Sequence, residues 1–572
     1  MGKVYHVVCA TMRSMTDDLA GYPPLLATLL RKRGITNTAE AEVFLNPSYE
    51  RDIGDPFGIL NMERAVERIF SAMERNESIV VYGDYDCDGI PGSVVLHDML
   101  KKFEYPHFKN YIPHRHEEGY GLNLNAVEKF ADEGVKLIIT VDCGIADVVS
   151  VTRAQELGVD VIVTDHHLPQ EVLPPAYTIL NSKQEGDTYP DNMLCGAGVA
   201  WKLSQALIAR APAELRAKIP EGFEKWLLDM AGLSTIADMV PLKKENRALA
   251  YFGLKVLRKS KRPGLKILLQ KAGVSQAYLA EDDVGFMIAP RINAASRMST
   301  PFEAFELLST TDPARAEHLA NHLNSLNDTR KGIVATMIKE ARHNLEMREL
   351  RKVIVVGNPL WRPGVLGLAA NKLMEDYGRP AFVWGRAESE HIKGSCRSDG
   401  SINVVKLMTS VREGFFLNVG GHEYSGGFSV SHENVHFLED AILEAYERLE
   451  KKTADDRAII ADAELTIDDV AWKTWDVVEK LAPFGVENPK PIFVLKGIEV
   501  FEVRMFGKEK NHLELSFRNG RGQKVSAIGF FATDESFKVK PVAGARIDLY
   551  ATLEKSMFRG RPELRLRIMD VM

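Results

Sequence analysis

The sequence is poor in cysteine and has no long apolar run. Its 572 residues include only five cysteines, none of them in a Cys-x-x-Cys pair, which excludes a disulfide framework and fits a reducing compartment. No stretch of eighteen apolar residues occurs, and the N-terminal segment is too short and too interrupted for a secretory signal. We therefore expect a soluble, cytoplasmic protein that does not enter a membrane.

A strong positive charge is also missing. The formal net charge of −7 argues against a protein that coats nucleic acid nonspecifically. The charge is nevertheless uneven, because residues 500–572 carry 14 Lys and Arg against 9 Asp and Glu. A basic C-terminal module on an acidic chain would let a nuclease separate strand binding from an acidic metal site. The alternative is that the excess of Lys and Arg is a chance variation in a short segment.

Three aspartates on alternating positions, Asp84, Asp86 and Asp88, follow a short apolar run. With the glycine after them they match the start of a helix-loop-helix calcium site. That loop needs a bidentate Glu where Val95 stands, and a helix in front where the sequence predicts a strand. Capping of the next helix would explain one aspartate but not three. The triplet therefore favours a different metal site.

Strands and helices alternate through the first half of the chain. This alternation is typical of a parallel sheet with crossover helices. We expect strands at 78–82, 136–141 and 160–164, and helices at 62–75, 92–103 and 146–157. Further on, the sequence predicts a long helix over 314–350, an α/β segment with a strand at 352–356 and a helix at 364–377, and a small β-barrel after about 492.

Further acidic and imidazole side chains stand where the predicted strands end. Asp142 ends one strand, and Asp165, His166 and His167 end the next. Because the carboxyl ends of parallel strands share one sheet edge, these residues should meet the aspartate triplet there. Asp238, in a helix-to-loop turn, adds a fourth element. Carboxylates with one or two imidazoles are typical of a paired Mn²⁺ or Mg²⁺ site that acts on phosphate, rather than of zinc.

Four motifs carry a resemblance to a known family. GDYDCDG, TVDCGI, VTDHH and STIADMVPL, in this order, resemble the DHH phosphoesterase superfamily. Other stretches, among them LCGAGVAWKL, PRINAASRM, GSCRS and GGHEYSGGF, resemble its RecJ branch, the single-strand-specific 5′ to 3′ DNA exonucleases.

The resemblance implies an α/β fold with several domains. The parts are a parallel-sheet DHH catalytic domain, a long connecting helix, a second α/β DHH-associated domain and a C-terminal OB-like β-barrel. The expected boundaries are a helical lead-in at 1–60, the catalytic domain at 61–300, the connecting helix at 301–350, the associated domain at 351–455 and the OB-like domain at 456–572.

The resemblance also implies roles for single residues. Metal ligands are expected at Asp86, Asp88, Asp142, His166 and Asp238, with Asp84 as a less certain sixth. Asp142 is expected to bridge both ions. His167 is expected near the scissile phosphate as a hydrogen-bond donor or general acid, and its alternative role is to orient a ligand.

A second set of residues is implied for the substrate. For the terminal 5′ phosphate and the DNA backbone, the resemblance implies Arg115, Arg291, Asn293, Arg297, Ser395, Arg397 and His422. The planar fork of arginine suits bidentate binding of phosphate. In the barrel, stacking aromatic residues would come from Phe501, Phe506, Phe517, Phe530, Phe531 and Phe558, most of which we expect in the core.

The implied activity is release of mononucleotides from 5′ ends of single-stranded DNA, dependent on two Mn²⁺ or Mg²⁺ ions, in recombination and repair. We expect a monomer, with a single-strand-binding protein and a helicase as candidate partners. One alternative is a DHH phosphodiesterase for short oligoribonucleotides or cyclic dinucleotides, which would lack the barrel. Another is a non-catalytic replication scaffold, which predicts eroded ligands. Departures from the family pattern at Pro91, Ser296 and Arg362 indicate a divergent member and remove no metal ligand.

Overall fold

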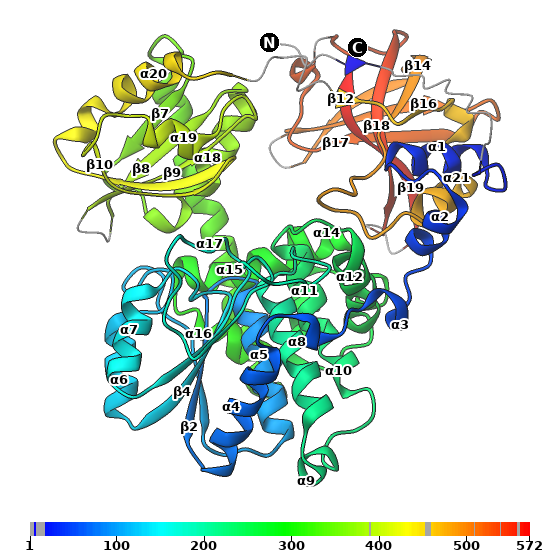
Figure 1. Ribbon diagram of the computed structural model, residues 1–572. Coiled ribbons are helices and arrows are strands. Elements are labelled where there is room, and N and C mark those ends of the chain that lie inside the picture. The colour runs from blue at the N-terminus through cyan, green and yellow to red at the C-terminus, as the bar shows by residue number, and fades with distance from the viewer. Residues whose placement is uncertain are drawn as a thin grey trace. The chain divides into compact units, whose positions relative to one another are not determined.

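The computed structural model describes residues 5–6, 18–387, 391–451, 459–507, 510–537, 539–557 and 561–572. The chain divides into two units (Figure 1). One joins residues 1–48 with residues 453–572, and the other spans residues 49–452. Across the described residues, no helix is both long and apolar enough to cross a membrane.

The larger unit begins with a five-stranded sheet in which every pairing is parallel. Side chains alternate along β2 (Ser78–Gly83): Ile79 and Val81 enter one apolar core, and Val80 and Tyr82 enter another. Burial on both faces explains the continuous apolar runs that predicted these strands. The spatial order is β3 (Phe108–Tyr111), β2 (Ser78–Gly83), β4 (Val135–Val141), β5 (Asp160–Thr164) and β6 (Thr178–Leu180).

Helices cover both faces of this sheet (Figure 1). The first core packs α4 (Met62–Glu74), α5 (Gly89–Lys102) and α8 (Gly196–Arg210) against one face, and the second packs α6 (Leu124–Asp132) and α7 (Val148–Glu156) against the other. The predicted parallel sheet with crossover helices is therefore confirmed.

The sheet has a topological switch point between β2 and β4. The chain leaves β2 to form β3 on one side and then returns to form β4 on the other. In open parallel sheets a crevice opens at such a point beyond the carboxyl ends of the strands, and ligands bind there. The aspartate triplet follows β2 and Asp142 follows β4, so both lie at this crevice.

A helical region follows and ends in the long helix α17 (Pro313–Glu346) of 34 residues. Leu319 and Leu323 of α17 enter the core of the parallel sheet, whereas Met337 and Ala341 enter that of the second sheet. The predicted connecting helix is thus confirmed. The other helices here are α3 (Tyr49–Asp52), α9 (Ala213–Arg216), α10 (Phe223–Trp226), α11 (Leu228–Ala237), α12 (Lys244–Leu257), α13 (Pro263–Ala272), α14 (Glu281–Asp283), α15 (Ala289–Met298) and α16 (Phe302–Ser309).

The second sheet of the larger unit is mixed, with β7 and β8 parallel and the other pairs antiparallel. Its order is β10 (Phe416–His422), β11 (Ser425–Val430), β9 (Ile392–Arg397), β8 (Ala381–Gly385) and β7 (Ile354–Asn358). It is accompanied by α18 (Pro363–Tyr377), α19 (Val404–Thr409) and α20 (Leu438–Arg448).

The smaller unit is built on a seven-stranded sheet around one apolar core. Its order is β13 (Ala463–Glu464), β14 (Phe493–Glu499), β18 (Arg546–Ser556), β19 (Glu563–Val571), β17 (Lys524–Gly529), β16 (His512–Arg518) and β15 (Glu502–Phe506), with α21 (Trp472–Glu479) beside it. A two-stranded sheet pairs β1 (Tyr5–His6) with β12 (Ile459–Ile460).

The N-terminal helices belong to this same core. Leu26, Leu29 and Leu30 of α1 (Pro24–Lys32) are buried with the barrel strands, and α2 (Thr38–Leu45) contributes Ala41. The helical lead-in thus packs on the C-terminal module (Figure 1). The five domain boundaries given above stay a prediction.

Candidate metal centre and arginine cluster

The aspartate triplet forms a tight turn between β2 and α5. Asp84 N donates to Val141 O at 3.0 Å, which keeps the turn beside the end of β4. Asp86 Oδ1 accepts from Asp88 N at 2.7 Å and from Gly89 N at 3.3 Å, so one aspartate does cap the following helix. The other two carboxylates take no part in that capping.

Asp88 is held by the N-terminus of a second helix. Its two carboxylate oxygens accept from Gly196 N at 2.6 Å and Ala197 N at 2.8 Å, the first two residues of α8. The positive end of a helix favours a carboxylate in this position. The loop and helix that follow β6 therefore fix a residue that follows β2.

Asp142 lies directly after β4 in a strained backbone conformation. Its φ of 63° is in the left-handed region, which few residues other than glycine adopt, and its side chain is buried. Asp142 N donates to Thr164 O at 2.9 Å, so the position is also tied to the end of β5. Strain of this kind persists where the surrounding structure imposes it, as at functional sites.

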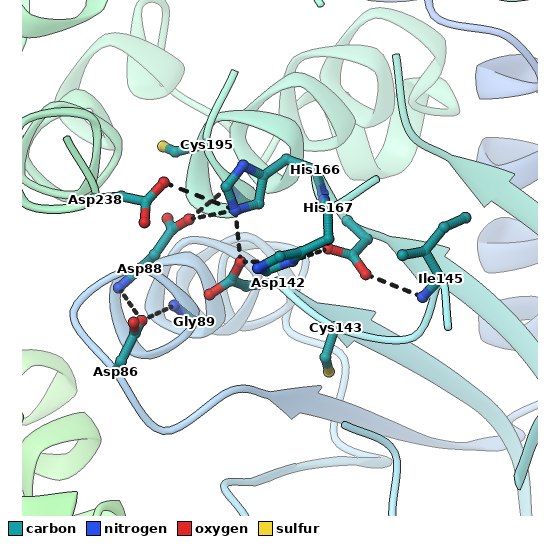
Figure 2. A network of polar contacts seen from close by, with 12 residues as sticks. Asp86, Asp88, Gly89, Asp142, Cys143, Ile145, His166, His167, Cys195 and Asp238 are labelled. Atoms are coloured by element: carbon teal, nitrogen blue, oxygen red, sulfur yellow. Dashed lines mark hydrogen bonds and ion pairs between the residues drawn. The ribbon is translucent and has the colours of Figure 1, made fainter. Parts of the chain in front are cut away.

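His166 lies at the centre of the cluster, as Figure 2 shows. Its Nε2 is 3.1 Å from Asp142 Oδ1, 3.6 Å from Asp88 Oδ2 and 3.7 Å from Asp238 Oδ2. One imidazole nitrogen therefore faces carboxylates that come from three separate elements.

His167 is held by Asp165 instead. Asp165 Oδ1 is 2.8 Å from His167 Nδ1 and also accepts from His166 N at 2.7 Å, while its Oδ2 accepts from Ile145 N at 3.0 Å. Asp165 thus has both oxygens engaged in fixing the loop. The Tyr120 hydroxyl also lies 3.0 Å from His167 Nδ1.

The carboxylates repel one another in a buried place. Burial and the charge of Asp86 raise the pKa of Asp84 well above its usual value, and the same two causes raise the pKa of Asp88 to about 6. Burial, Asp88 and Asp86 raise the pKa of Asp142 well above its usual value and that of Asp238 to about 9. The positive charges of Arg115 and Lys183 lower the pKa of Asp84 and of Asp238, respectively, but less than the other causes raise them.

The two neighbouring histidines differ. Burial and then the charge of His167 lower the pKa of His166 to about 3, which keeps its ring neutral. Burial also lowers the pKa of His167, but the hydrogen bond and charge of Asp165 outweigh it and raise the pKa overall. A neutral imidazole can bind a metal ion, whereas a protonated one can donate to a phosphate oxygen.

The side chains that meet here fit divalent cations. Three groups have ligand atoms within 4.8 Å of one another: Asp84, Asp86 and Asp142; Asp88, His166 and Asp238; and Asp142, His166 and His167. Among the described residues, no hydrogen-bond donor reaches the buried Asp84 Oδ1 or Asp142 Oδ1. Carboxylate oxygens with one imidazole suit Mn²⁺ or Mg²⁺. Cys143 is buried and points away from the carboxylates (Figure 2).

The arginines expected at the terminal phosphate also gather. Burial, and then the charges of Arg115, Arg330 and Arg397, lower the pKa of Arg297, on α15, to about 9. Arg330, on α17, is the member that motif matching did not identify. Ser395 and Arg397 are two residues apart on β9 and therefore point to one face of the sheet.

The other expected substrate residues lie around these two clusters. Arg291 donates from Nε to Asn324 Oδ1 at 3.0 Å. Burial, and then the charge of Arg291, lower the pKa of Arg330. Asn293 Oδ1 is buried and meets no donor among the described residues. His422, exposed at the end of β10, has its pKa lowered by burial and then by the charges of His167 and Lys183.

Aromatic residues of the smaller unit divide between its core and its surface. Phe517 is buried, whereas Phe501 and Phe531 are exposed. Arg518 lies 3.9 Å from the ring centroid of Phe501, and Arg567 lies 4.2 Å from that of Phe530. Phe506 contacts the rings of His512 and Phe530. Phe558 lies outside the described residues.

Comparison with known proteins finds the same three parts. Sequence models of the DHH family, N-terminal domain, match residues 78–233; those of the DHHA1 domain match 350–451; and those of the RecJ OB domain match 461–570. The predicted α/β fold with a C-terminal OB-like sheet is thereby confirmed.

Full-length relatives agree with these matches. A Bacillus subtilis protein named single-stranded-DNA-specific exonuclease RecJ is 36% identical over 98% of this chain and 69% of its own length. The crystal structure of RecJ in complex with Mn²⁺ from Thermus thermophilus has a TM-score of 0.79 and 27% identity, and covers 97% of this chain and 77% of its own. The Mg²⁺ complex from the same organism has a TM-score of 0.73 and 25% identity, covering 97% and 76%. A chain with this domain order and this identity over nearly its whole length belongs to the RecJ family of the DHH superfamily.

Proposed function

We propose that this protein is a metal-dependent exonuclease that degrades single-stranded DNA from the 5′ end to mononucleotides, in DNA recombination and repair. The observation that carries the proposal is the cluster of five carboxylates and His166 at the switch point, in the same unit as the arginine cluster. The names of its relatives and the metal-bound structures among them support it.

Two groups of ligands would hold two Mn²⁺ or Mg²⁺ ions. Asp84, Asp86 and Asp142 form one group, and Asp88, His166 and Asp238 form the other. Asp142 Oδ1 is 3.1 Å from His166 Nε2 and Asp142 also belongs to the first group, which supports it as the bridging ligand. When bound, two such ions generate a nucleophile from water at neutral pH and neutralise charge on the scissile phosphate.

His167 has the geometry of a phosphate donor rather than of a ligand. Asp165 engages its Nδ1 and raises its pKa, so the ring can carry a proton toward the substrate. This supports the role of hydrogen-bond donor or general acid, with Asp165 as its positioning residue.

The arginine cluster would select the strand end. Arg115, Arg297, Arg397 and Ser395 would bind the terminal 5′ phosphate, and Arg291, Asn293 and His422 would contact the DNA backbone. Hydrolysis of the bond between phosphorus and the 3′ oxygen of the first nucleotide frees a mononucleotide and leaves a new 5′ phosphate. The shortened strand would then present the same group to the same arginines.

The smaller unit would bind the strand. Exposed Phe501 and Phe531, with Arg518 and Arg567 beside aromatic rings, provide stacking surfaces and positive charge. This module is not expected in a phosphodiesterase for cyclic dinucleotides. A non-catalytic scaffold is not favoured either, because every ligand expected from the sequence is present in the cluster.

Several finer features belong to the same proposal. They are the five domain boundaries stated above, a single-strand-binding protein and a helicase as partners, a monomer as the working state, and action in the cytoplasm.

End-labelled substrates test the proposed function. Single strands labelled at the 5′ or the 3′ end are incubated with Mn²⁺ or Mg²⁺, alongside blunt duplex, RNA and a cyclic dinucleotide, with Asp142→Ala as the inactive control. We expect labelled mononucleotide to appear at once only from the 5′-labelled single strand. Release that starts at the 3′ end, or equal activity on blunt duplex, would sink the proposal.

A further inference from the structure

Four arginines from four separate elements share one volume of the larger unit. Arg297 comes from α15, Arg397 from β9, Arg330 from α17, and Arg115 from the segment between β3 and α6. Among the described residues, none of the four has a carboxylate oxygen within the 4.0 Å of an ion pair. Four unpaired cations held together repel one another, and a bound anion relieves that repulsion.

The cluster is built around the first turns of α18. Arg297 Nη1 donates to Gly364 O at 2.8 Å. A Cβ atom at Gly367 would lie 3.0 Å from Arg397 Nη2, so this guanidinium packs closely against α18 at a glycine. The positive end of α18 and the arginines therefore face the same space, and both favour an anion.

Arg330 and Asn327 interrupt an otherwise apolar stripe of α17. Positions 323, 327, 330, 334 and 337 follow helical spacing along one face, and Leu323 and Met337 are buried there in two successive cores. Asn327, fully buried, and Arg330 stand between them. Polar groups on a buried stripe need a partner, and one that the protein does not supply comes from water or from a ligand.

One donor of the Arg330 guanidinium is already engaged and a neighbouring one is not. Its Nη2 donates to Asn327 Oδ1 at 2.9 Å, one turn back on the same helix. Its Nε is buried and meets no acceptor among the described residues. A fixed guanidinium with a vacant buried donor is suited to a phosphate oxygen.

We infer that Arg330, on α17, is a further specificity-determining residue that binds the terminal 5′ phosphate of the strand. Its charge would make the site favour a phosphate with two negative charges over one with a single charge. The inference rests on the proposed function. A terminal phosphate carries a charge of about −1.5 to −2 at neutral pH, whereas an internal phosphodiester carries one charge. Each additional arginine therefore favours the strand end over the interior.

Binding without turnover tests this role. Fluorescence anisotropy is measured in EDTA with a short single strand, labelled at its 3′ end, that carries either a 5′ phosphate or a 5′ hydroxyl. The preference of the wild-type protein for the 5′ phosphate should fall about tenfold in Arg330→Gln, the loss of one charge-assisted hydrogen bond. Binding of the 5′-hydroxyl strand should change little.

Two variants complete the design. Arg315→Gln, on the same helix but in an exposed ion pair with Glu306, should keep the wild-type preference. Arg330→Lys keeps the charge without the planar fork and should retain an intermediate preference. The melting temperature of Arg330→Gln shows whether that variant folds. If it does not fold, the preference of Arg330→Lys tests the inference instead.

The inference is overturned if the preference stays at the wild-type value in either Arg330 variant, or if both strands lose affinity equally. That result is distinct from failure of the proposed function, because cleavage of the 5′-phosphorylated strand by the wild-type protein with Mn²⁺ is measured separately.

Discussion

Asp142 combines features that a residue with a purely structural role avoids. It is a buried carboxylate, and its φ is 63°. Burial, and then the charges of neighbouring carboxylates, raise its pKa well above the usual value. Each feature costs stability, and together they persist only if they serve a ligand.

Replacing this charge should therefore stabilise the metal-free protein. Asp142→Asn keeps the size of the side chain and tolerates the left-handed backbone, because asparagine visits that region readily. We expect the melting temperature of the metal-free variant to rise by about 2–4 °C per kcal/mol of repulsion removed. The rise that Mn²⁺ produces in the wild type should disappear, and exonuclease activity should fall about a thousandfold.

Thermal unfolding with and without Mn²⁺ measures both effects, with Asp132→Asn as the control on an exposed carboxylate. An Asp142→Asn variant that Mn²⁺ still stabilises as much as the wild type would show that Asp142 is not a ligand.

The family resemblance implies different roles for His166 and His167, but the residues of the sequence give no physical reason for the difference. The two are adjacent, and only the fold shows that Asp165 engages the second while the first faces Asp88, Asp142 and Asp238. Arg330 was not found for a related reason. It lies in a helix with no motif of its own, and its significance depends on residues far away in the chain.

At the scale of elements, the start of α8 organises the metal ligands. Gly196 and Ala197 donate their N–H groups to Asp88, and Gly196 also lies against Asp142. A Cβ atom at Gly196 would be 2.5 Å from Asp142 Cβ, closer than real atoms approach. Although α8 contributes no ligand itself, it thus sets the distance between the ligands Asp88 and Asp142.

Gly196→Ala should consequently weaken metal binding. The added methyl group must displace Asp142 or the first turn of α8, and displacement of a supporting group costs about 10- to 100-fold in metal affinity or activity. Titration calorimetry with Mn²⁺ measures the affinity directly.

Gly198→Ala is the matched control for this change. Its Cβ would meet Leu194 and Cys195 only at ordinary contact distances of 3.5 and 3.6 Å, so its Mn²⁺ affinity should equal that of the wild type. Equal affinities in both variants would mean that α8 does not position the ligands.

Most elements near the site could be predicted, because their patterns are local. The expected strand at 136–141 is β4 (Val135–Val141), and the expected helix at 364–377 is α18 (Pro363–Tyr377). The helix expected from residue 92 begins at Gly89, since Asp86 caps it earlier than the apolar pattern indicates. The support that α8 gives to Asp88 could not be predicted, because backbone N–H groups have no signature in a sequence.

At the scale of the whole molecule, the proposed metal ligands and the aromatic residues proposed to stack on the strand belong to different units. The metal ligands lie in residues 49–452, and the cation–aromatic pairs of the OB domain lie in residues 453–572. Metal binding and strand binding should therefore respond to changes in different units.

Arg567→Gln should weaken binding of single-stranded DNA without changing Mn²⁺ affinity. The loss of one phosphate contact lowers the slope of log affinity against log salt by about 0.7 to 1. Anisotropy titrations at several salt concentrations give this slope. Arg504→Gln, whose charge is paired with Glu514 in the same sheet at 2.6 Å, is the control and should leave the slope unchanged. A slope that is the same in wild type and Arg567→Gln would exclude Arg567 as a phosphate contact.

The partner of the N-terminal helices could not be predicted from the sequence, because an amphipathic helix specifies that it needs an apolar surface but not which one. The structure assigns Leu29 of α1 to the core of the OB domain, with Phe493 and Leu549 from strands more than 400 residues away in the sequence. Leu29→Ala should therefore cost about 2–5 kcal/mol of stability in the smaller unit alone.

Scanning calorimetry should then resolve two transitions that respond separately. Leu29→Ala should lower the transition of the smaller unit and leave the other in place, whereas Mn²⁺ should raise only the transition of the larger unit, since a ligand stabilises the part that binds it. Val43→Ala, on the neighbouring helix with 45% of the side chain exposed, should shift neither. If Leu29→Ala and Mn²⁺ moved the same transition, the lead-in would be part of the folding unit of the metal centre, and the assignment of residues 18–48 to the OB domain would be wrong.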